Sequence, residues 1–444
     1  MSRSSLINTL VMFTVLLSAC TSATQTAAPA PIVSATTAAP TATALPSATP
    51  TAQPQLADFS LHVAADLPER FQESLSLPPA LKEVTDAAQA DLTLDVLAES
   101  ETGDFSANWV YALVAPFPTI EDGITLKDLQ SFWKDGQNGL FGQSPLLVSP
   151  ETRALFEKVW GPADEKAVQN VDASQLLDTA WAERPAWALV PFEALEPRWK
   201  VLRVDEVSPL DKDFDTAAYG LTVRLGISGN TQALEALKRE TNTALFASGN
   251  RNAEHLTSLM LTGTTAMVRY MAQRMEENGV LYPATDIKKV FGSVDIVHIS
   301  NEVPFYEQCP PANPVRREMR FCSDPKYFEL LQDIGMDVVE LTGNHILDWG
   351  VDPLLYTIDL YDQKGIKYYG GGRNESDARK ALIVEDHGNR LGFIGCSPAG
   401  PTNVWATATQ PGSAQCDFDY IRTQIQDMLA DGIIPIFTFQ HYES

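Results

Sequence analysis

The stretch ELTGNHILDWG, residues 340–350, overlaps the end of an apolar run that begins at Met336 and predicts a buried strand. Asn344, His345 and Asp348 come directly after this run. In layered α/β folds, loops that follow the carboxyl ends of buried strands line the crevice where ligands bind. The stretch therefore predicts an α/β fold with a functional site at its strand ends.

Helices and strands alternate on both sides of this stretch. Ser323 or Asp324 is expected to cap a helix, and Asp352 is expected to cap the next one, because a proline follows each cap in the first turn. The predicted strands are residues 256–262, 294–299, 336–341, 366–369 and 433–439. A hairpin is expected to pair residues 381–384 with residues 391–394. Further helices are expected over residues 268–276 and 418–429.

The preceding part of the chain predicts a second α/β domain over residues 57–250. Apolar strands are expected at 109–116 and 186–191, with helices at 125–133 and 151–159. The order of these segments loosely resembles solute-binding proteins, which implies a ligand cleft. A scaffold or spacer without a ligand is an equally good interpretation, because no ligand-holding motif stands out.

The first residues indicate export. An apolar stretch too short to span a bilayer follows Arg3 and ends at Cys20, and this arrangement resembles the bacterial lipoprotein signal, residues 1–20. The alternative is an ordinary signal peptide with an incidental cysteine. Residues 21–56 are rich in Ala, Thr and Pro, which predicts a disordered tether. We therefore expect an extracytoplasmic protein whose membrane attachment rests on a lipid at Cys20.

The charge balance excludes one kind of partner, and the cysteines predict disulfides. The chain has 57 Asp plus Glu against 32 Lys plus Arg, so nucleic acid is excluded as an expected partner. The cysteines other than Cys20 are Cys309, Cys322, Cys396 and Cys416. Two disulfides are expected in an oxidising compartment, and pairing of sequence neighbours is the simplest of three connectivities.

Polar residues follow several predicted strands at the same end. They are Thr264 and Thr265, residues 300–302, Asn344 with His345, and His441. Histidine, amide and carboxylate groups from separate loops are what a hydrolytic metal site requires. Other interpretations stay open: Asn344 caps a helix or holds a left-handed turn, His345 is a satisfied buried histidine, and His298 is structural.

The segments TGNHILDWG and YYGGGRNESDARKALIVEDHGNRLGFIG (368–395) closely resemble the CapA family of capsule and poly-γ-glutamate synthesis proteins, which are related to calcineurin-like metallophosphatases. SLMLTGTTAMVR (258–269), DIVHISNEVPF (295–305) and TFQHYES (438–444) match further blocks of that family in order. The resemblance implies a CapA-like α/β sandwich over 254–444. Its C-terminus is expected to be truncated, because a later histidine-bearing segment of the family lies beyond Ser444.

The resemblance also implies roles for individual residues. Asn344, Glu302 and His441 would bind a divalent metal ion, Mn, Zn or Fe, and His345 would act as an acid or electrostatic stabiliser oriented by Asp348. One departure matters: Thr264 stands where the family usually has aspartate, and a hydroxyl is a weaker ligand than a carboxylate.

Two hypotheses about function follow. In the first, the chain serves the synthesis or export of a capsular polymer like poly-γ-glutamate, and its partners are that polymer or the synthesis machinery; if it is an enzyme, it is a metal-dependent hydrolase. In the second, it is a non-catalytic, lipid-anchored binding protein of the envelope with a degenerate CapA-like scaffold.

Overall fold

The computed structural model describes residues 53–98, 103–315 and 317–441. The predicted signal segment, its lipidation at Cys20 and nearly all of the predicted tether lie outside these residues. The described residues from Pro54 onward are divided below into an N-terminal and a C-terminal part, each described by itself. Within the described part, no helix is both long and apolar enough to cross a bilayer.

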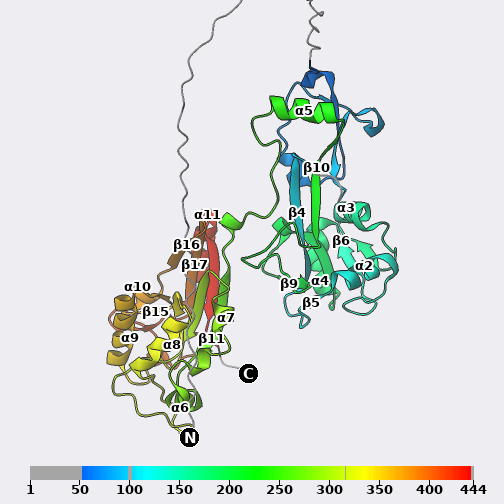
Figure 1. The fold of residues 1–444 in the computed structure, drawn as a ribbon. Helices are drawn as coiled ribbons and strands as arrows, with labels where there is room; N and C mark the ends of the chain where they lie inside the picture. Colours follow the sequence, from blue (N-terminus) through cyan, green and yellow to red (C-terminus); the bar gives the residue numbers. More distant parts are fainter. Residues whose placement is uncertain (1–52, 99–102, 316, 442–444) are drawn as a thin grey trace, which may run out of the picture. The chain divides into compact units, whose positions relative to one another are not determined.

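The N-terminal part is built on a ten-stranded sheet (Figure 1). Its strands are β1 (Ser60–Val63), β2 (Lys82–Glu83), β3 (Leu92–Val96), β4 (Ser106–Pro116), β5 (Gly123–Ile124), β6 (Leu146–Val148), β7 (Val168–Asn170), β8 (Trp187–Pro191), β9 (Trp199–Val204) and β10 (Thr222–Gly229). The main order is β2-β1-β3-β10-β4-β8-β6-β7, with β9 on β4 and β5 on β9. Because β10 runs antiparallel to both β3 and β4, it joins the parallel strands β2-β1-β3 to a mixed group in which β4 is antiparallel to β8 and β9.

Helices cover both faces of this sheet. They are α1 (Glu69–Glu73), α2 (Leu126–Asp135), α3 (Pro150–Trp160), α4 (Leu176–Ala182) and α5 (Thr231–Glu240). The period of two along β4 places Trp109, Tyr111 and Leu113 in the large core with α2 and α3, whereas Ala112 and Val114 pack with α4 on the opposite face. The α/β prediction for this part is confirmed.

The C-terminal part contains two larger sheets. Its strands are β11 (Leu259–Thr265), β12 (Ile296–Asn301), β13 (Val338–Glu340), β14 (Lys367–Tyr369), β15 (Gly371–Gly372), β16 (Leu382–Asp386), β17 (Asn389–Cys396), β18 (Gly412–Ser413) and β19 (Ile434–Phe439). Strands β11-β12-β13-β14 form a parallel sheet in chain order. A second sheet has the order β16-β17-β19 and is mixed, because β17 is antiparallel to β16 and parallel to β19.

The two sheets pack as a sandwich with helices outside. The helices are α6 (Arg269–Asn278), α7 (Lys288–Phe291), α8 (Phe328–Asp333), α9 (Val351–Lys364), α10 (Glu375–Ala378) and α11 (Phe418–Ala430). Val338 of β13 packs between the sheets against Phe393, whereas Val339 faces the core formed with α6, α8 and α9. Ile394 and Met428 belong to the core between β17 and α11. This α/β arrangement agrees with the predicted sandwich.

Three predicted details are wrong. Asp352 does not cap α9; Gly350 occupies the N-cap with φ +90°, and Asp352 lies in the first turn. Thr264 and Thr265 are the last residues of β11 instead of a loop. Ser300 and Asn301 likewise end β12 and are buried, because β12 is covered by helices on one face and by the second sheet on the other. Only Glu302 of residues 300–302 follows its strand.

Both predicted disulfides are present with the sequence-local connectivity. Cys309 pairs with Cys322 and Cys396 pairs with Cys416. The first closes a loop that precedes α8, and the second ties the end of β17 to the segment before α11.

A buried chain of polar side chains connects the two sheets. His298 Nε2 lies 2.8 Å from the Tyr369 hydroxyl, and that hydroxyl lies 2.8 Å from Thr438 Oγ1. Thr438 and Thr342 both donate to Glu340 Oε1, at 2.8 and 2.6 Å. Because these hydrogen-bonded side chains join β12, β13, β14 and β19, they fix the register of one sheet against the other.

This network of buried polar side chains predicts that the stability of the C-terminal part depends on pH. Burial lowers the pKa of His298 from 6.5 to about 4. Between these values the folded protein binds fewer protons than the unfolded chain, so stability falls as the pH falls through this window. His298 alone should make the C-terminal part about 2 kcal/mol less stable at pH 5 than at pH 7.5.

Hydrogen exchange of the β12 amides at the two pH values measures this difference. His298→Gln should remove most of it, whereas the exposed His255→Gln should keep the wild-type difference. An unchanged pH dependence in His298→Gln would contradict the assignment.

Candidate functional site

One cavity of about 660 Å³ lies at the carboxyl ends of the strands. It is lined by Thr264, Glu302, Met319, Asn344, His345, Asp348, Pro401, Gln440 and His441. Thr264 lies at the end of β11, one residue before its last, Glu302 follows β12, Asn344 lies in the loop after β13, and His441 follows β19. The structure therefore brings every predicted catalytic or metal-binding residue to one cavity.

Two loops meet closely at this cavity. A Cβ atom on Gly343 would lie 2.5 Å from the Glu302 Cα atom and 2.7 Å from the Glu302 carbonyl oxygen. Real side chains do not tolerate such distances to a backbone, so glycine is required here by space. This close approach places Glu302 beside Asn344, the residue that follows the glycine.

Asn344 does not have the structural roles that the sequence left open. The next helix, α9, has Gly350 at its N-cap, and Asn344 is absent from the residues with positive φ in the described chain. Its side chain makes no hydrogen bond within the described residues. The amide oxygen is therefore available to a ligand in the cavity.

His345 and Asp348 form a pair of fixed orientation. His345 Nδ1 lies 2.7 Å from Asp348 Oδ2, and the same oxygen accepts a 2.7 Å hydrogen bond from the Phe321 backbone N–H. The Phe321 ring packs edge-on against the imidazole, with ring centroids 4.7 Å apart. Because a carboxylate accepts the Nδ1 proton, Nε2 is the imidazole atom left for chemistry.

The electrostatics of the cavity are those of a half-buried acid near an imidazole. The hydrogen bond to Asp348 raises the pKa of His345 above 6.5, with Glu302 adding in the same direction. Burial raises the pKa of Glu302, while His345 lowers it and Asp348 raises it. None of the described residues lining the cavity is Lys or Arg, although the charge of Arg269, which does not line it, opposes the rise in the pKa of His345.

The donor set fits a divalent cation. Glu302 offers a carboxylate, Asn344 an amide oxygen and His441 an imidazole, which are ligands for hard or borderline metals. The exposed hydroxyl of Thr264 lies where a further carboxylate would strengthen the site. These residues suit a single, comparatively weak metal site.

Several cavity residues were not predicted from the sequence. Gln440 donates to Glu302 Oε1 at 3.3 Å and so links the end of β19 to the end of β12. Met319 lines the cavity from the disulfide-closed loop, and Phe321 of the same loop holds Asp348. Proximity in sequence to His441 could have indicated Gln440. Nothing in the sequence of the 310–321 loop indicated that it returns to the site.

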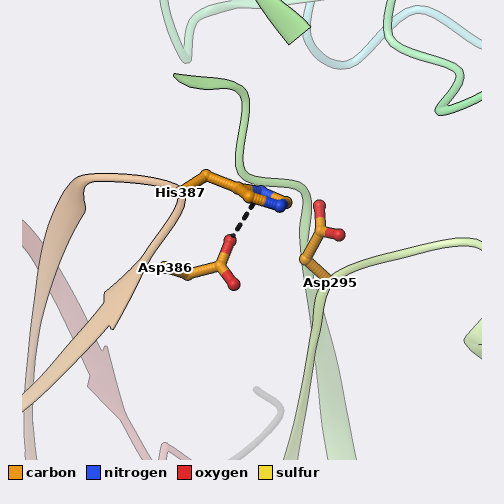
Figure 2. A group of neighbouring side chains, drawn as sticks. All are labelled: Asp295, Asp386 and His387. Atoms are coloured by element: carbon orange, nitrogen blue, oxygen red, sulfur yellow. Dashed lines mark ion pairs between the residues drawn. The ribbon is translucent and has the colours of Figure 1, made fainter. Parts of the chain in front are cut away.

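A second group of metal-binding residue types lies elsewhere. Figure 2 shows Asp295, Asp386 and His387, whose ligand atoms lie within 4.8 Å of one another. Asp295 precedes β12 and the other two lie at the β16–β17 turn, so the group lies at the opposite end of β12 from Glu302. Ser258 donates to Asp295, and His387 Nδ1 lies 2.9 Å from a backbone carbonyl. These atoms already have protein partners, and we assign no metal to them.

Comparisons with known proteins agree with the resemblance seen in the sequence. Residues 258–439 match the family model of the bacterial capsule synthesis protein PGA_cap. The chain is 24% identical over 177 residues to the capsule biosynthesis protein CapA of Bacillus anthracis, which covers 40% of this chain and 43% of that protein. It is 21% identical over 168 residues to the PGA biosynthesis protein CapA of Bacillus subtilis (strain 168), covering 37% and 43% respectively. The matches thus span less than half the length of either curated relative.

Solved structures with a similar arrangement include an ABC-type phosphate transport receptor from Vibrio cholerae. It has 15% identity and a TM-score of 0.30, and the match covers 41% of this chain and 94% of that one. PstS from Borrelia burgdorferi has 10% identity and a TM-score of 0.30, with 40% and 91% covered.

Proposed function

We propose that residues 258–439, which match the family model of a bacterial capsule synthesis protein, form a CapA-type domain, and that the chain serves the synthesis or export of a capsular polymer of the poly-γ-glutamate kind. We further propose that the cavity at its strand ends is a metal-dependent hydrolytic site. The observation that carries the second proposal is the convergence of Glu302, Asn344, His345 and His441 on one cavity from three separate loops.

Each cavity residue has a role in this proposal. Glu302, Asn344 and His441 would hold the metal ion. When bound, the ion supplies Lewis-acid polarisation and a water of lowered pKa. His345 holds a proton at Nε2 because Asp348 fixes the imidazole through Nδ1 and raises its pKa, which suits it to protonate a leaving group. Gln440 orients the Glu302 carboxylate.

The cellular setting is part of the proposal. A lipid on Cys20 would hold the protein at the outer face of the membrane, where a capsular polymer is exported. The proposed partners are the polymer or the proteins that make it.

The alternative function is that of a non-catalytic envelope binding protein. The exposed Thr264 in place of a carboxylate favours this alternative, because it leaves the metal site with fewer strong ligands. Metal binding separates the two functions.

Metal analysis of the purified chain tests the hydrolytic site. After incubation with Mn²⁺ or Zn²⁺ and removal of free ions, about one equivalent should remain bound. Asn344→Ala should weaken metal binding by about tenfold or more, because it removes a ligand, whereas Asn278→Ala at the exposed end of α6 should not. His345→Ala should retain the metal while losing hydrolysis of a γ-glutamyl anilide.

One outcome of the metal analysis would contradict the hydrolytic site. A trace of metal well below one equivalent, unchanged in Asn344→Ala, would exclude the hydrolytic site and leave the binding-protein alternative.

A further inference from the structure

A second cavity, in the N-terminal part, has the composition of a ligand site. Its volume is about 210 Å³, which exceeds the roughly 150 Å³ of an apolar cavity that accommodates benzene. Leu176 and Leu177 of α4, Val190 of β8, and Trp199 provide an apolar wall. All four are at least 90% buried and belong to the core on the α4 face of the sheet. The wall is therefore preformed.

The polar wall of this cavity is acidic. The carboxylates lining it are Asp66, Glu69, Glu151, Glu193 and Glu196, and Arg70 is the one basic side chain among the described residues lining it. Asp66 already pairs with Lys158 at 2.7 Å and Glu196 with Arg198 at 3.7 Å, which leaves the other three carboxylates with Arg70 as the one basic side chain on the cavity lining. An anion entering the cavity would meet a net negative field.

Glu193 is the carboxylate that is held in place. Asn250 donates to its Oε2 atom and is itself fixed by two hydrogen bonds to the backbone of Val110 in β4, at 2.7 and 2.8 Å. Burial raises the pKa of Glu193 above its usual value, with Arg70 only partly opposing this effect. A cation at this carboxylate would therefore offset the unfavourable burial of its charge.

An independent observation points to a ligand at the same place. Tyr111 is 98% buried, lines the cavity, and its hydroxyl makes no hydrogen bond within the described residues. Burial raises the pKa of this hydroxyl, and the nearby charges of Glu193 and Glu151 raise it further. The hydroxyl is thus neutral and beside two carboxylates. The hydroxyl oxygen is not enclosed by protein atoms but is open to the cavity, where a ligand or water can satisfy it.

We propose that this cavity binds a small organic ammonium compound. Glu193, with Glu151 beside it, receives the ammonium group, and the Tyr111 hydroxyl adds a hydrogen bond. The wall of Leu176, Leu177 and Trp199 packs against the hydrocarbon portion. The proposal concerns the N-terminal part only and stands independently of the metal site.

Calorimetric titration of the full chain with three probes of one shape tests the proposal. The probes are benzylammonium, neutral benzyl alcohol and anionic benzoate, with inorganic phosphate as a fourth ligand. Benzylammonium should bind at least about tenfold more tightly than benzyl alcohol, because a desolvated charged hydrogen bond distinguishes them. Benzoate and phosphate should not bind in this cavity.

Variants locate the binding. Glu193→Gln keeps an oxygen for Asn250 but removes the charge, and it should weaken benzylammonium binding by about tenfold. Tyr111→Phe should weaken it several-fold. Glu83→Gln, on the exposed strand β2 and outside the cavity, alters net charge equally and should leave the affinity unchanged.

The remaining outcomes contradict the proposal. Equal affinities for benzylammonium and benzyl alcohol would show that the cavity does not select positive charge. Tighter binding of benzoate or phosphate than of benzylammonium would show that the cavity is an anion site instead of an ammonium site. If Glu83→Gln weakened benzylammonium binding as much as Glu193→Gln, the effect would come from the net charge of the protein and not from this cavity. Failure of every probe to bind a folded chain at millimolar concentration would overturn the proposal.

Discussion

Gly343→Ala is expected to lower the free energy of unfolding of the C-terminal part by about 3 kcal/mol and to abolish metal binding. The added methyl group would lie 2.5 Å from the Glu302 Cα atom, and the contacted atoms belong to a backbone that cannot rotate away. The loop after β13 must then move from the end of β12. That movement separates Asn344 from Glu302, two of the three proposed metal ligands.

Gly263→Ala is the matched control. Gly263 lies on β11 near the same cavity, and a Cβ atom there would have no other atom within 4 Å. This variant should be within about 0.5 kcal/mol of the wild type and keep its metal affinity. Hydrogen exchange of β12 and β13 amides and metal titration measure both effects. Wild-type stability and metal affinity in Gly343→Ala would show that the two backbones are not closely packed.

Removal of the Cys309–Cys322 disulfide, by Cys309→Ser with Cys322→Ser, is the other large effect. The sequence separation is 13 residues, for which a loss of about 3 kcal/mol is expected, because the unfolded chain is no longer constrained. The loop should also release Asp348, whose Oδ2 atom accepts the Phe321 N–H. The His345 imidazole then loses its orientation, so hydrolysis should decline more than metal binding.

The second disulfide provides the comparison. Cys396→Ser with Cys416→Ser removes a bridge of separation 20 and should destabilise by a similar amount, about 3 kcal/mol, without freeing the 310–321 loop. Trypsin should cleave after Arg317 or Arg320 much faster in the first double variant than in the second. Equal cleavage rates in the two variants would show that the first disulfide does not hold this loop against the site.

The sequence predicted most of the C-terminal fold because its signals are local. Gly365 ends α9 in a left-handed conformation, and the turn of the predicted β16–β17 hairpin lies at His387 and Gly388, both with positive φ. Predicted boundaries differ by three residues at β11 and by two at β12, because tertiary pairing decides where a strand stops.

The candidate site was predicted in part for the same reason. Asn344, His345 and Asp348 are close in the sequence, and parallel strands bring their ends to one side of a sheet. Gln440 and Phe321 were missed, because their contacts with Glu302 and Asp348 span 138 and 27 residues. No local pattern encodes such contacts.

The sequence by itself determined the α/β class of the two parts, the approximate positions of the strands of the parallel sheet, and the residue types available for a metal site. These follow from periodicity, capping residues and turns, which act over a few neighbouring positions. Only the tertiary structure decided that Gly343 packs against Glu302, that a disulfide-closed loop returns to Asp348, and that Tyr111 faces carboxylates in a separate cavity. Those facts depend on how distant segments pack in space, and close packing is a property of the folded chain as a whole.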